Sequence, residues 1–328
     1  MIGAVVIGRN EGERLQLCLE SVRRQVDIVV YVDSGSSDNS IALAQSLGAH
    51  VVELDMARPF TAARARNAGW RSLMILCPDI AYIQFIDGDC ELVEGWVSSA
   101  AAILNAQDRC AAVWGVLRER YPQRSPYNFL CDLEWRYSWP FGEVGLFGGI
   151  TMIRHTAFHD VDGMREDMVA GEEPETAFRM RQKGWTIIRL EQVMAIHDAS
   201  MTRFSQWWQR ARRAGFAYAQ GALLHGRTRD RYCMRDLRGI FLWGFVLPSL
   251  MILLLLVVSW WALLLMLLYP LSMMRTARFF HAQRQASWKD AWCYAAACTA
   301  AKFPQLLGIF TFLYRWFRRH DAVLIEYK

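Results

Sequence analysis

Two aspartates, Asp87 and Asp89, stand one residue apart and directly follow a short apolar run that contains Ile83, Phe85 and Ile86. The run predicts a buried strand, so the two carboxylates would lie at its end. Carboxylates held this close together are unfavourable unless a cation neutralises them. Mg²⁺ is usually bound by one or two carboxylates, while phosphate groups complete its shell. The stretch therefore predicts a divalent-cation site beside a phosphate-bearing ligand, with a simple acidic turn as the alternative.

A second acidic feature is the segment Gly171-Glu-Glu-Pro-Glu175. Proline is favoured at the first helical position, so the pattern predicts that Pro174 opens a helix with Glu173 at its N-terminus. The helix dipole there favours an ionised carboxylate by roughly 0.3–1 kcal/mol. A carboxylate that faces an acceptor hydroxyl can take its proton as the hydroxyl attacks, which is general-base catalysis. Helix capping is the alternative role, above all for Glu172.

Alternating strands and helices are predicted to position these residues. Apolar runs at 2–8 and 27–33 predict buried strands, and each is followed by a helical pattern. Successive units of this kind form an α/β fold with a mostly parallel sheet. Ligands of such sheets bind outside the carboxyl ends of the strands. Asn10, Asp33 and the Asp87–Asp89 pair all fall at that edge.

Four short motifs follow the predicted strands: Asn10-Glu11, Asp33-Ser-Gly-Ser-Ser-Asp38, Ala65-Arg-Asn-Ala-Gly69 and Asp87-Gly-Asp89. The turn at 33–38 lacks the spacing of a dinucleotide-binding loop, and no P-loop pattern stands near it. In order and spacing, the four motifs resemble those of family 2 glycosyltransferases. The resemblance covers roughly residues 2–215. It implies a GT-A fold, which is Rossmann-like with a mostly parallel sheet.

The resemblance also implies a role for each matching residue. Nucleotide-sugar binding falls on Asn10, Glu11, Asp33, Arg66, Asn67 and Asp87. Mg²⁺ or Mn²⁺ would be held by Asp87, Asp89 and His197, and Glu173 would be the catalytic base of an inverting transfer. Ser34 stands where the family often has a second acid, so a UDP-sugar is a default donor rather than a deduced one.

A membrane region is predicted after the α/β domain. Hydrophobic residues make up 53% of the chain, and residues 239–274 contain no Asp, Glu, Lys, Arg or His. These 36 residues would extend about 54 Å as one helix, against a hydrocarbon core of about 30 Å. The stretch therefore predicts a hairpin at about 240–274. A further apolar segment at about 290–314 carries Lys302 and Pro304, and is predicted to be an interfacial or membrane helix.

A basic segment joins the two regions. Residues 203–238 hold nine arginines against two aspartates, and Phe204, Trp207 and Trp208 share one helical face. Such a helix typically lies in a membrane interface near anionic headgroups. The run Gln206-Trp-Trp-Gln-Arg210 does not match the Gln-x-x-Arg-Trp motif of processive synthases. The predicted division is thus 1–202 for the transferase domain, 203–238 for the interface segment and 239–328 for the membrane region.

These features lead us to expect a membrane-anchored, inverting hexosyltransferase that forms cell-envelope or exopolysaccharide glycans. Its expected partners are a nucleotide-sugar donor, a lipid-linked or glycan acceptor and membrane lipids, but no nucleic acid. Lysines and arginines flank the apolar segments, which places the catalytic domain on the cytoplasmic side of the inner membrane. The alternatives are a polyprenyl-phosphate monosaccharide transferase, a processive synthase, or a non-catalytic membrane protein that binds sugar nucleotide or polysaccharide.

Overall fold

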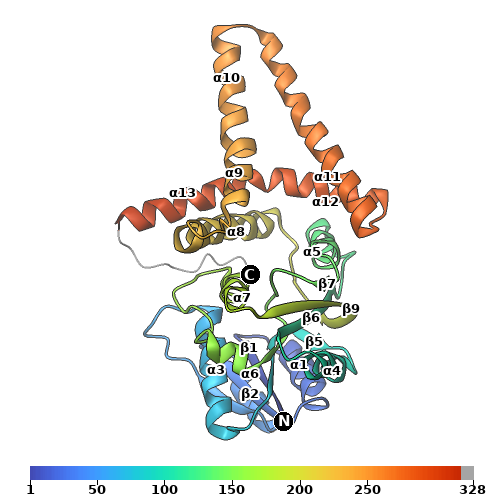
Figure 1. Cartoon of the computed structure of the whole chain (residues 1–328), viewed down its shortest axis with the longest axis vertical. Helices are drawn as coiled ribbons and strands as arrows, with labels where there is room; N and C mark the ends of the chain where they lie inside the picture. The colour runs from blue at the N-terminus through green and yellow to red at the C-terminus, as the bar shows by residue number, and fades with distance from the viewer. Residues whose placement is uncertain (319–328) are drawn as a thin grey trace. The chain divides into compact units, whose positions relative to one another are not determined.

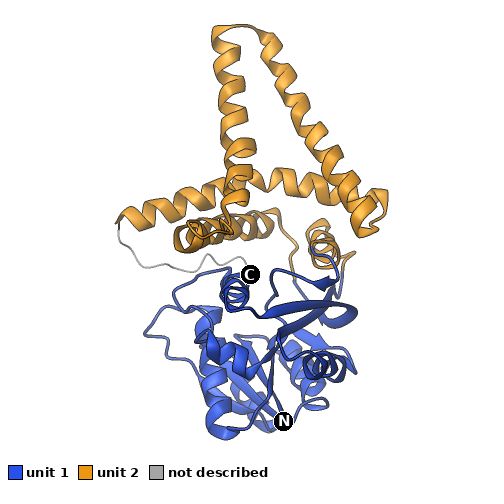
Figure 2. Cartoon of the chain, viewed as in Figure 1, with its two compact units in different colours: residues 1–121, 139–199 blue, residues 122–138, 200–328 orange. Residues whose placement is uncertain are grey.

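The computed structural model describes residues 1–318, and the chain divides into two compact units (Figure 2). The first unit comprises residues 1–121 and 139–199. The second comprises residues 122–138 and the chain from Ser200 onward. The division near residue 200 lies close to the predicted boundary at 202. Residues 122–138 are part of the second unit, although in sequence they interrupt the first. The division predicted from sequence placed them in the transferase domain.

A nine-stranded sheet forms the centre of the first unit, with the order β3-β2-β1-β4-β8-β6-β9-β5 and with β7 paired to β9 (Figure 1). The strands are β1 (Ile2–Gly8), β2 (Ile28–Asp33), β3 (His50–Glu53), β4 (Tyr82–Asp87), β5 (Cys90–Leu92), β6 (Cys110–Glu119), β7 (Gly142–Glu143), β8 (Thr151–Arg154) and β9 (Thr186–His197). Strands β1 to β4 pair in parallel, which confirms the predicted α/β fold. Strand β8 pairs antiparallel with β4 and β6, so the sheet is mixed beyond β4.

Helices of the first unit cover this sheet. They are α1 (Glu13–Arg23), α2 (Ser40–Ser46), α3 (Ala62–Leu76), α4 (Trp96–Ala106), α6 (His155–Asp160) and α7 (Glu172–Gln182). The apolar stripe of α1 is buried, and it consists of Leu15, Cys18, Leu19 and Val22. Helix α7 begins at Glu172, two residues before the predicted start. Pro174 therefore lies within the first turn of the helix. Backbone N–H groups in this turn have no partner within the helix, so the N–H that proline lacks costs no helical hydrogen bond.

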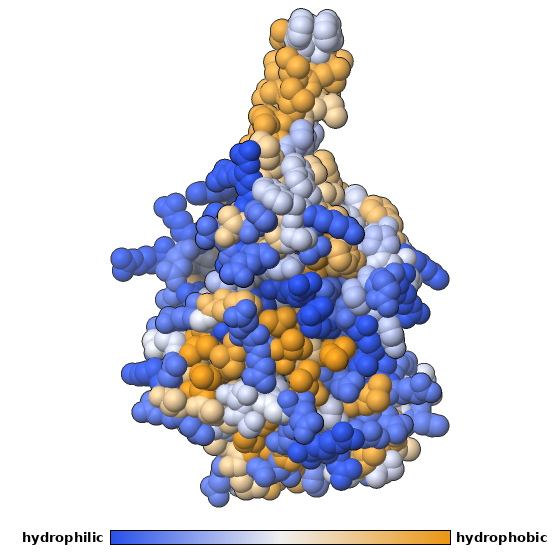
Figure 3. Space-filling view, turned by 90° about the vertical axis from the view of Figure 1, so that its right-hand side faces the viewer, coloured by the Kyte–Doolittle hydropathy of each residue, from blue (hydrophilic) through white to orange (hydrophobic). Residues whose placement is uncertain are grey.

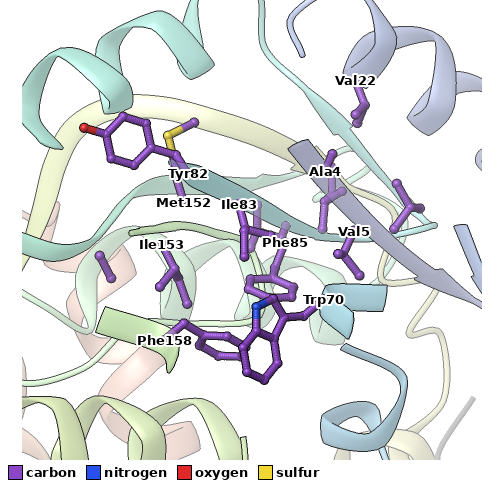
Figure 4. Packing of buried hydrophobic residues seen from close by; sticks show 14 of the residues in the cluster. Ala4, Val5, Val22, Trp70, Tyr82, Ile83, Phe85, Met152, Ile153 and Phe158 are labelled. Carbon is purple, nitrogen blue, oxygen red and sulfur yellow. The ribbon is translucent and has the colours of Figure 1, made fainter. Parts of the chain in front are cut away.

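The core between the sheet and its helices holds the end of β4 in place. Figure 4 shows Ile83 and Phe85 of β4 packed near Trp70 of α3 and Phe158 of α6. The Trp70 and Phe158 rings meet edge to face with their centroids 5.0 Å apart. Because the apolar half of β4 is fully buried, its last residue, Asp87, emerges at a defined place.

Close packing of α3 against the sheet depends on Gly69. A β-carbon at this position would lie 2.3 Å from a methyl group of Val5 in β1. Glycine thus lets the helix approach the strand more closely than any other residue would allow. The approach brings Arg66 and Asn67, one turn earlier, towards the carboxyl edge of the sheet.

The second unit is helical. Its elements are α5 (Pro126–Tyr137), α8 (Phe204–His225), α9 (Met234–Phe241), the π-helix η1 (Leu242–Val246), α10 (Leu247–Val257), the 3₁₀-helix η2 (Trp260–Leu267), α11 (Leu268–Arg284), α12 (Trp288–Ala300) and α13 (Lys302–Arg318). By length and composition, three stretches are able to cross a membrane: Met234–Val257, Trp260–Arg284 and Trp288–Arg318.

The first two of these stretches form a hairpin within the second unit. They meet at Val258 and Ser259, near the middle of the hairpin predicted at about 240–274. Figure 3 shows the legs of the hairpin as a mostly hydrophobic surface. At the turn, the exposed rings of Trp260 and Trp261 stack with their centroids 4.3 Å apart. Tryptophans are common at membrane–water interfaces, so their position fits the far end of a membrane-spanning hairpin.

The third stretch differs, because α12 and α13 run crosswise to the legs of the hairpin (Figure 1). Helix α13 packs along α8, and two glycines allow the contact: β-carbons at Gly215 and Gly308 would lie 1.9 Å and 2.0 Å from carbonyl oxygens of the facing helix. Exposed apolar residues repeat at helical spacing along α13, namely Phe303, Leu307, Phe310, Tyr314 and Phe317. This stripe is typical of a helix that lies in a membrane surface.

Two arginines of α8 are engaged inside the second unit. Arg210 makes a two-pronged ion pair with Glu134 of α5, with N–O distances of 2.6 Å and 3.1 Å. Arg212 donates a hydrogen bond to Thr311 of α13. These guanidinium groups therefore stabilise the helix packing, whereas the sequence pattern assigned the basic face of α8 to lipid headgroups.

We expect Gly308→Ala to lower the melting temperature of the chain, because its new methyl group would collide with the backbone of α8. Overpacking of this kind costs about 1–3 kcal/mol. Alanine by itself stabilises a helix by about 1 kcal/mol relative to glycine. A lower melting temperature of Gly308→Ala would therefore be opposite to the effect of helix propensity. Gly239→Ala is the matched control, because nothing lies within 4 Å of its β-carbon. Equal melting temperatures for both variants would contradict the packing role of Gly308.

Candidate active site

Three carboxylates gather around one guanidinium at the carboxyl edge of the sheet. Arg66 of α3 donates through Nη2 to Asp87 Oδ1 at 2.9 Å. Its Nη1 donates to Glu173 Oε1 at 2.8 Å and to Glu172 Oε1 at 3.2 Å. The Arg66 side chain is only 3% exposed. This cluster brings together residues that stand more than 100 positions apart in the sequence.

The local structure explains why both glutamates reach Arg66. Gly171 caps α7 with a φ of 82°, a left-handed conformation that glycine adopts readily. The chain therefore turns sharply, and Glu172 and Glu173 occupy the first helical turn. Their exposure differs, because the side chain of Glu172 is 4% exposed and that of Glu173 is 16% exposed. Glu173 is thus the glutamate that a ligand in this site can contact.

The cluster retains negative charge. Burial on its own lowers the pKa of Arg66, but Asp87, Glu173 and Glu172 outweigh that effect and raise the pKa above its ordinary value. Arg66 is therefore a permanent cation, and it faces three carboxylates. One positive charge among three acids leaves a field that attracts a further cation.

Gly149 lies directly against this cluster, in the segment between β7 and β8. A β-carbon there would be 2.5 Å from Arg66 Nη2 and 3.1 Å from Glu173 Oε1. Arg66 has no freedom to move away, because it is buried and bonded to three carboxylates. The glycine therefore keeps open the space beside the two side chains.

We expect Gly149→Ala to lower turnover by about ten- to hundredfold, because a displacement of about 1 Å in an active site is sufficient for such a loss. Its melting temperature should fall as well, because buried Arg66 cannot move away from the new methyl group, so rates are compared at a temperature where both variants are folded. Gly148→Ala is the control, since its β-carbon has nothing within 4 Å. Steady-state rates of both variants test the role of Gly149, and normal turnover of Gly149→Ala would contradict it.

A second group of side chains lies at Asp89. His197 Nε2 is 3.1 Å from Asp89 Oδ2, and the Cys90 thiol lies 3.5 Å from Asp89 Oδ1. One ligand atom from each of the three residues lies within 4.8 Å of the others. Oxygen, nitrogen and sulfur atoms at this spacing fit a divalent cation. The predicted metal ligands are thus divided, because the structure joins Asp89 to His197 and pairs Asp87 with Arg66.

Asn10 and Asp33, which are predicted to bind the nucleotide, fix the conformation of the loops at the same edge of the sheet. Asn10 Oδ1 accepts a hydrogen bond from the backbone of Ser37 at 2.7 Å, which links the loops after β1 and β2. Buried Asp33 accepts from Tyr31 and from backbone amides of its own turn. Contact of these side chains with a nucleotide stays a prediction.

Two further predicted residues make structural contacts. Asn67 bonds to both backbone groups of Met164, with distances of 2.7 Å and 2.9 Å, and so holds the segment before α7. Glu11 forms an ion pair with Arg14 at 2.7 Å. Their part in nucleotide binding also stays a prediction.

Sequence reasoning missed two members of the site. Cys90 has no role in the prediction from sequence, although it stands directly after Asp89. Glu172 was assigned at most a capping role, whereas it shares Arg66 with Glu173. The cluster around Arg66 joins residues of α3, β4 and α7, so no local sequence pattern predicts it.

Comparison with known proteins shows which family and which fold this chain is similar to. Residues 4–161 match the model of the family described as Glycosyl transferase family 2. Over 150 residues the chain is 31% identical to a TPR repeat-containing protein of Synechococcus elongatus, a match that covers 44% of this chain and 35% of the relative. Over 51 residues it is 43% identical to an uncharacterized glycosyltransferase of Rickettsia felis, covering 16% and 18%. The chain thus spans about a third or less of the length of these relatives.

A solved structure resembles nearly the whole chain. It is a mannosyltransferase from Pyrobaculum calidifontis in complex with GDP-Man and Mn²⁺, and it superimposes with a TM-score of 0.58. The match covers 92% of this chain and 86% of that chain, at 18% sequence identity. At this level of identity, the likeness shows that the two chains share a fold.

Proposed function

We propose that the chain moves a sugar from a nucleotide-sugar donor to an acceptor at a membrane, and the premise is that residues 4–161 match the model of the family described as Glycosyl transferase family 2. The observation that carries the proposal is the cluster of Asp87, Glu172 and Glu173 around Arg66. It joins an acid from the carboxyl end of β4 to the glutamates of α7, and ligands of α/β sheets bind at this edge. A UDP-sugar is the donor we favour.

A divalent cation, Mg²⁺ or Mn²⁺, would be held through Asp89 and His197, with Asp87 close by in sequence. When bound, it would neutralise charge on the leaving diphosphate. Arg66 holds the Asp87 carboxylate beside this site, where the two groups can orient the donor. The buried position of Arg66 keeps its charge in an environment where electrostatic interactions are strong.

Glu173 is the general base in this proposal. The acceptor oxygen forms a bond to the anomeric carbon, the bond from that carbon to the diphosphate breaks, and the acceptor proton passes to the Glu173 carboxylate. One displacement from the face opposite the leaving group inverts the anomeric configuration. Glu173 is chosen over Glu172 because it is the more accessible of the two. The hydrogen bond from Arg66 Nη1 at 2.8 Å orients the Glu173 carboxylate before the acceptor binds.

The membrane role rests on the second unit. Through residue 318 it carries 18 lysines and arginines against 5 aspartates and glutamates, whereas the first unit carries 17 against 25. We propose that the hairpin of Met234–Val257 and Trp260–Arg284 spans the cytoplasmic membrane, with α12 and α13 in its surface. Basic residues then face anionic headgroups on the cytoplasmic side. The acceptor would be a lipid-linked saccharide or another membrane-proximal glycan.

A panel of nucleotide sugars, supplied with Mn²⁺ or Mg²⁺ to the full chain in lipid vesicles, tests the proposal. We expect one donor to be turned over, with release of its nucleoside diphosphate, and turnover to stop when a chelator removes the metal. Asp89→Ala should abolish turnover of that donor. Absence of turnover for every donor, with unchanged donor binding by Asp89→Ala, would contradict the enzymatic function.

A polyprenyl phosphate is the second acceptor to test. Its phosphate oxygen is already anionic, so transfer to it needs no base. A Glu173→Gln variant that retains full transfer to polyprenyl phosphate, but not to a hydroxyl acceptor, would identify this class.

A further inference from the structure

We infer that Cys90 is a third protein ligand of the metal site, so that the site binds thiophilic divalent ions such as Co²⁺ and Zn²⁺ in preference to Mg²⁺. The inference rests on the metal site of the proposed function and deepens it. A thiolate is a soft ligand that favours zinc and similar ions, whereas Mg²⁺ prefers oxygen.

Strand pairing brings the thiol to the site. Cys90 begins β5 and lies directly opposite His197 of β9 in an antiparallel pair. Residues opposite one another in such a pair project to the same face of the sheet. The Cys90 and His197 side chains therefore lie next to each other, and Asp89 precedes Cys90 in the chain.

The distances fit a tetrahedral ion. Metal bonds of about 2.0–2.3 Å place the ligand atoms of a tetrahedron roughly 3.3–3.8 Å apart. His197 Nε2 lies 3.1 Å from Asp89 Oδ2, and the Cys90 thiol lies 3.5 Å from Asp89 Oδ1, so each contact is near this range at a different oxygen of the carboxylate. One ligand atom from each residue lies within 4.8 Å of the others, so a small movement of the side chains brings all three to one ion. Within residues 1–318, this is the one group of three or more histidine, cysteine or acidic side chains at metal-binding spacing.

Asp87 does not complete this group. Its carboxylate is bonded to Arg66 at 2.9 Å. Three protein ligands leave a fourth position open, as is common in metal sites that bind a substrate. A phosphate oxygen of the donor has the right chemistry for that position. When the metal binds, the Cys90 thiol loses its proton to solvent.

Cobalt spectroscopy of the metal-free full chain tests this inference without any sugar donor. We expect added Co²⁺ to give a thiolate-to-cobalt charge-transfer band in the near ultraviolet, which Cys90→Ser lacks. The visible cobalt bands from Asp89 and His197 should remain. Competition titrations should show that Cys90→Ser weakens Co²⁺ binding by at least about tenfold, because changes even outside the first ligand shell cost 10–100-fold. Mg²⁺ binding should change much less.

Cys77→Ser is the matched control. Cys77 is also buried in the first unit, but it contacts Met1 near the amino ends of the strands. It should keep the charge-transfer band and the Co²⁺ affinity of the unaltered chain. A band that persists in Cys90→Ser, or that is missing from the unaltered chain, would overturn the inference. A chain that binds Co²⁺ through Cys90 but turns over no donor would instead count against the proposed function alone.

Discussion

Under the proposed function, Glu173→Gln should lower the rate of sugar transfer to a hydroxyl acceptor by about 10²–10⁴-fold, the contribution expected of a general base. Glutamine keeps the size of the side chain and can still accept a hydrogen bond from Arg66, but it cannot take the acceptor proton. Donor affinity should therefore change little, so the loss falls on kcat. Initial rates and donor-binding titrations on the same preparation measure the two quantities.

Two variants show whether the effect belongs to Glu173. Glu191→Gln removes an exposed carboxylate of β9 and should leave the rate unchanged. Glu172→Gln removes the more deeply buried carboxylate beside Arg66 and should lower the rate less than Glu173→Gln. If Glu172→Gln is the inactive variant and Glu173→Gln transfers normally, the base has been assigned to the wrong glutamate.

Arg66→Met lowers the free energy of unfolding by about 3–5 kcal/mol, the cost of removing one partner from a buried ion pair. Asp87, Glu172 and Glu173 then lose their shared cation. The Glu172 and Glu173 side chains are only 4% and 16% exposed, so water compensates little for the loss. For a unit of this size, the melting temperature should fall by roughly 6–20 °C. Arg71→Met is the control on the same helix, because Arg71 is 61% exposed and exposed ion pairs contribute only about 0–1 kcal/mol.

The pH dependence of the Arg66→Met defect has a definite sign. Without the guanidinium, the three carboxylates have no shared cation in the folded state, and their mutual repulsion lowers the stability of the fold at neutral pH. Acid removes the negative charge of carboxylates, so this repulsion weakens as the pH falls. The difference in melting temperature between Arg66→Met and the unaltered chain should therefore shrink on acidification. A difference that is constant with pH would show that the loss comes from packing rather than from charge.

Sequence periodicity predicts the first half of the sheet well. Strands β1, β2 and β4 are largely apolar runs that end at, or directly before, a polar residue, so both their type and their carboxyl ends can be derived. Strand β8 is harder to derive, because the apolar run at 146–153 contains Gly148 and Gly149, and only Thr151–Arg154 pairs in the sheet. The glycines instead leave space beside Arg66, which is a tertiary requirement.

The candidate site is only partly predictable, for a physical reason. Asp87, Arg66 and Glu173 can each be singled out by residue type and local position. Their ion pairs depend on how closely α3 approaches β1, and this follows from the contact between Gly69 and Val5. The pairing of Asp89 with His197 depends on the register of β5 and β9, which are separated by more than 90 residues. Such long-range registers leave no local pattern.

The membership of α5 in the second unit limits how the protein can be divided. The chain passes between the units near residues 121, 138 and 199, so no single cut separates them. A fragment that ends at residue 202 would retain α5 but lose Arg210, the ion-pair partner of Glu134, and Tyr294, which bonds to Ser138. Helix α5 would then expose surfaces that the helical unit normally covers. A soluble catalytic fragment therefore requires a short linker in place of residues 122–138 as well as removal of the C-terminal helices.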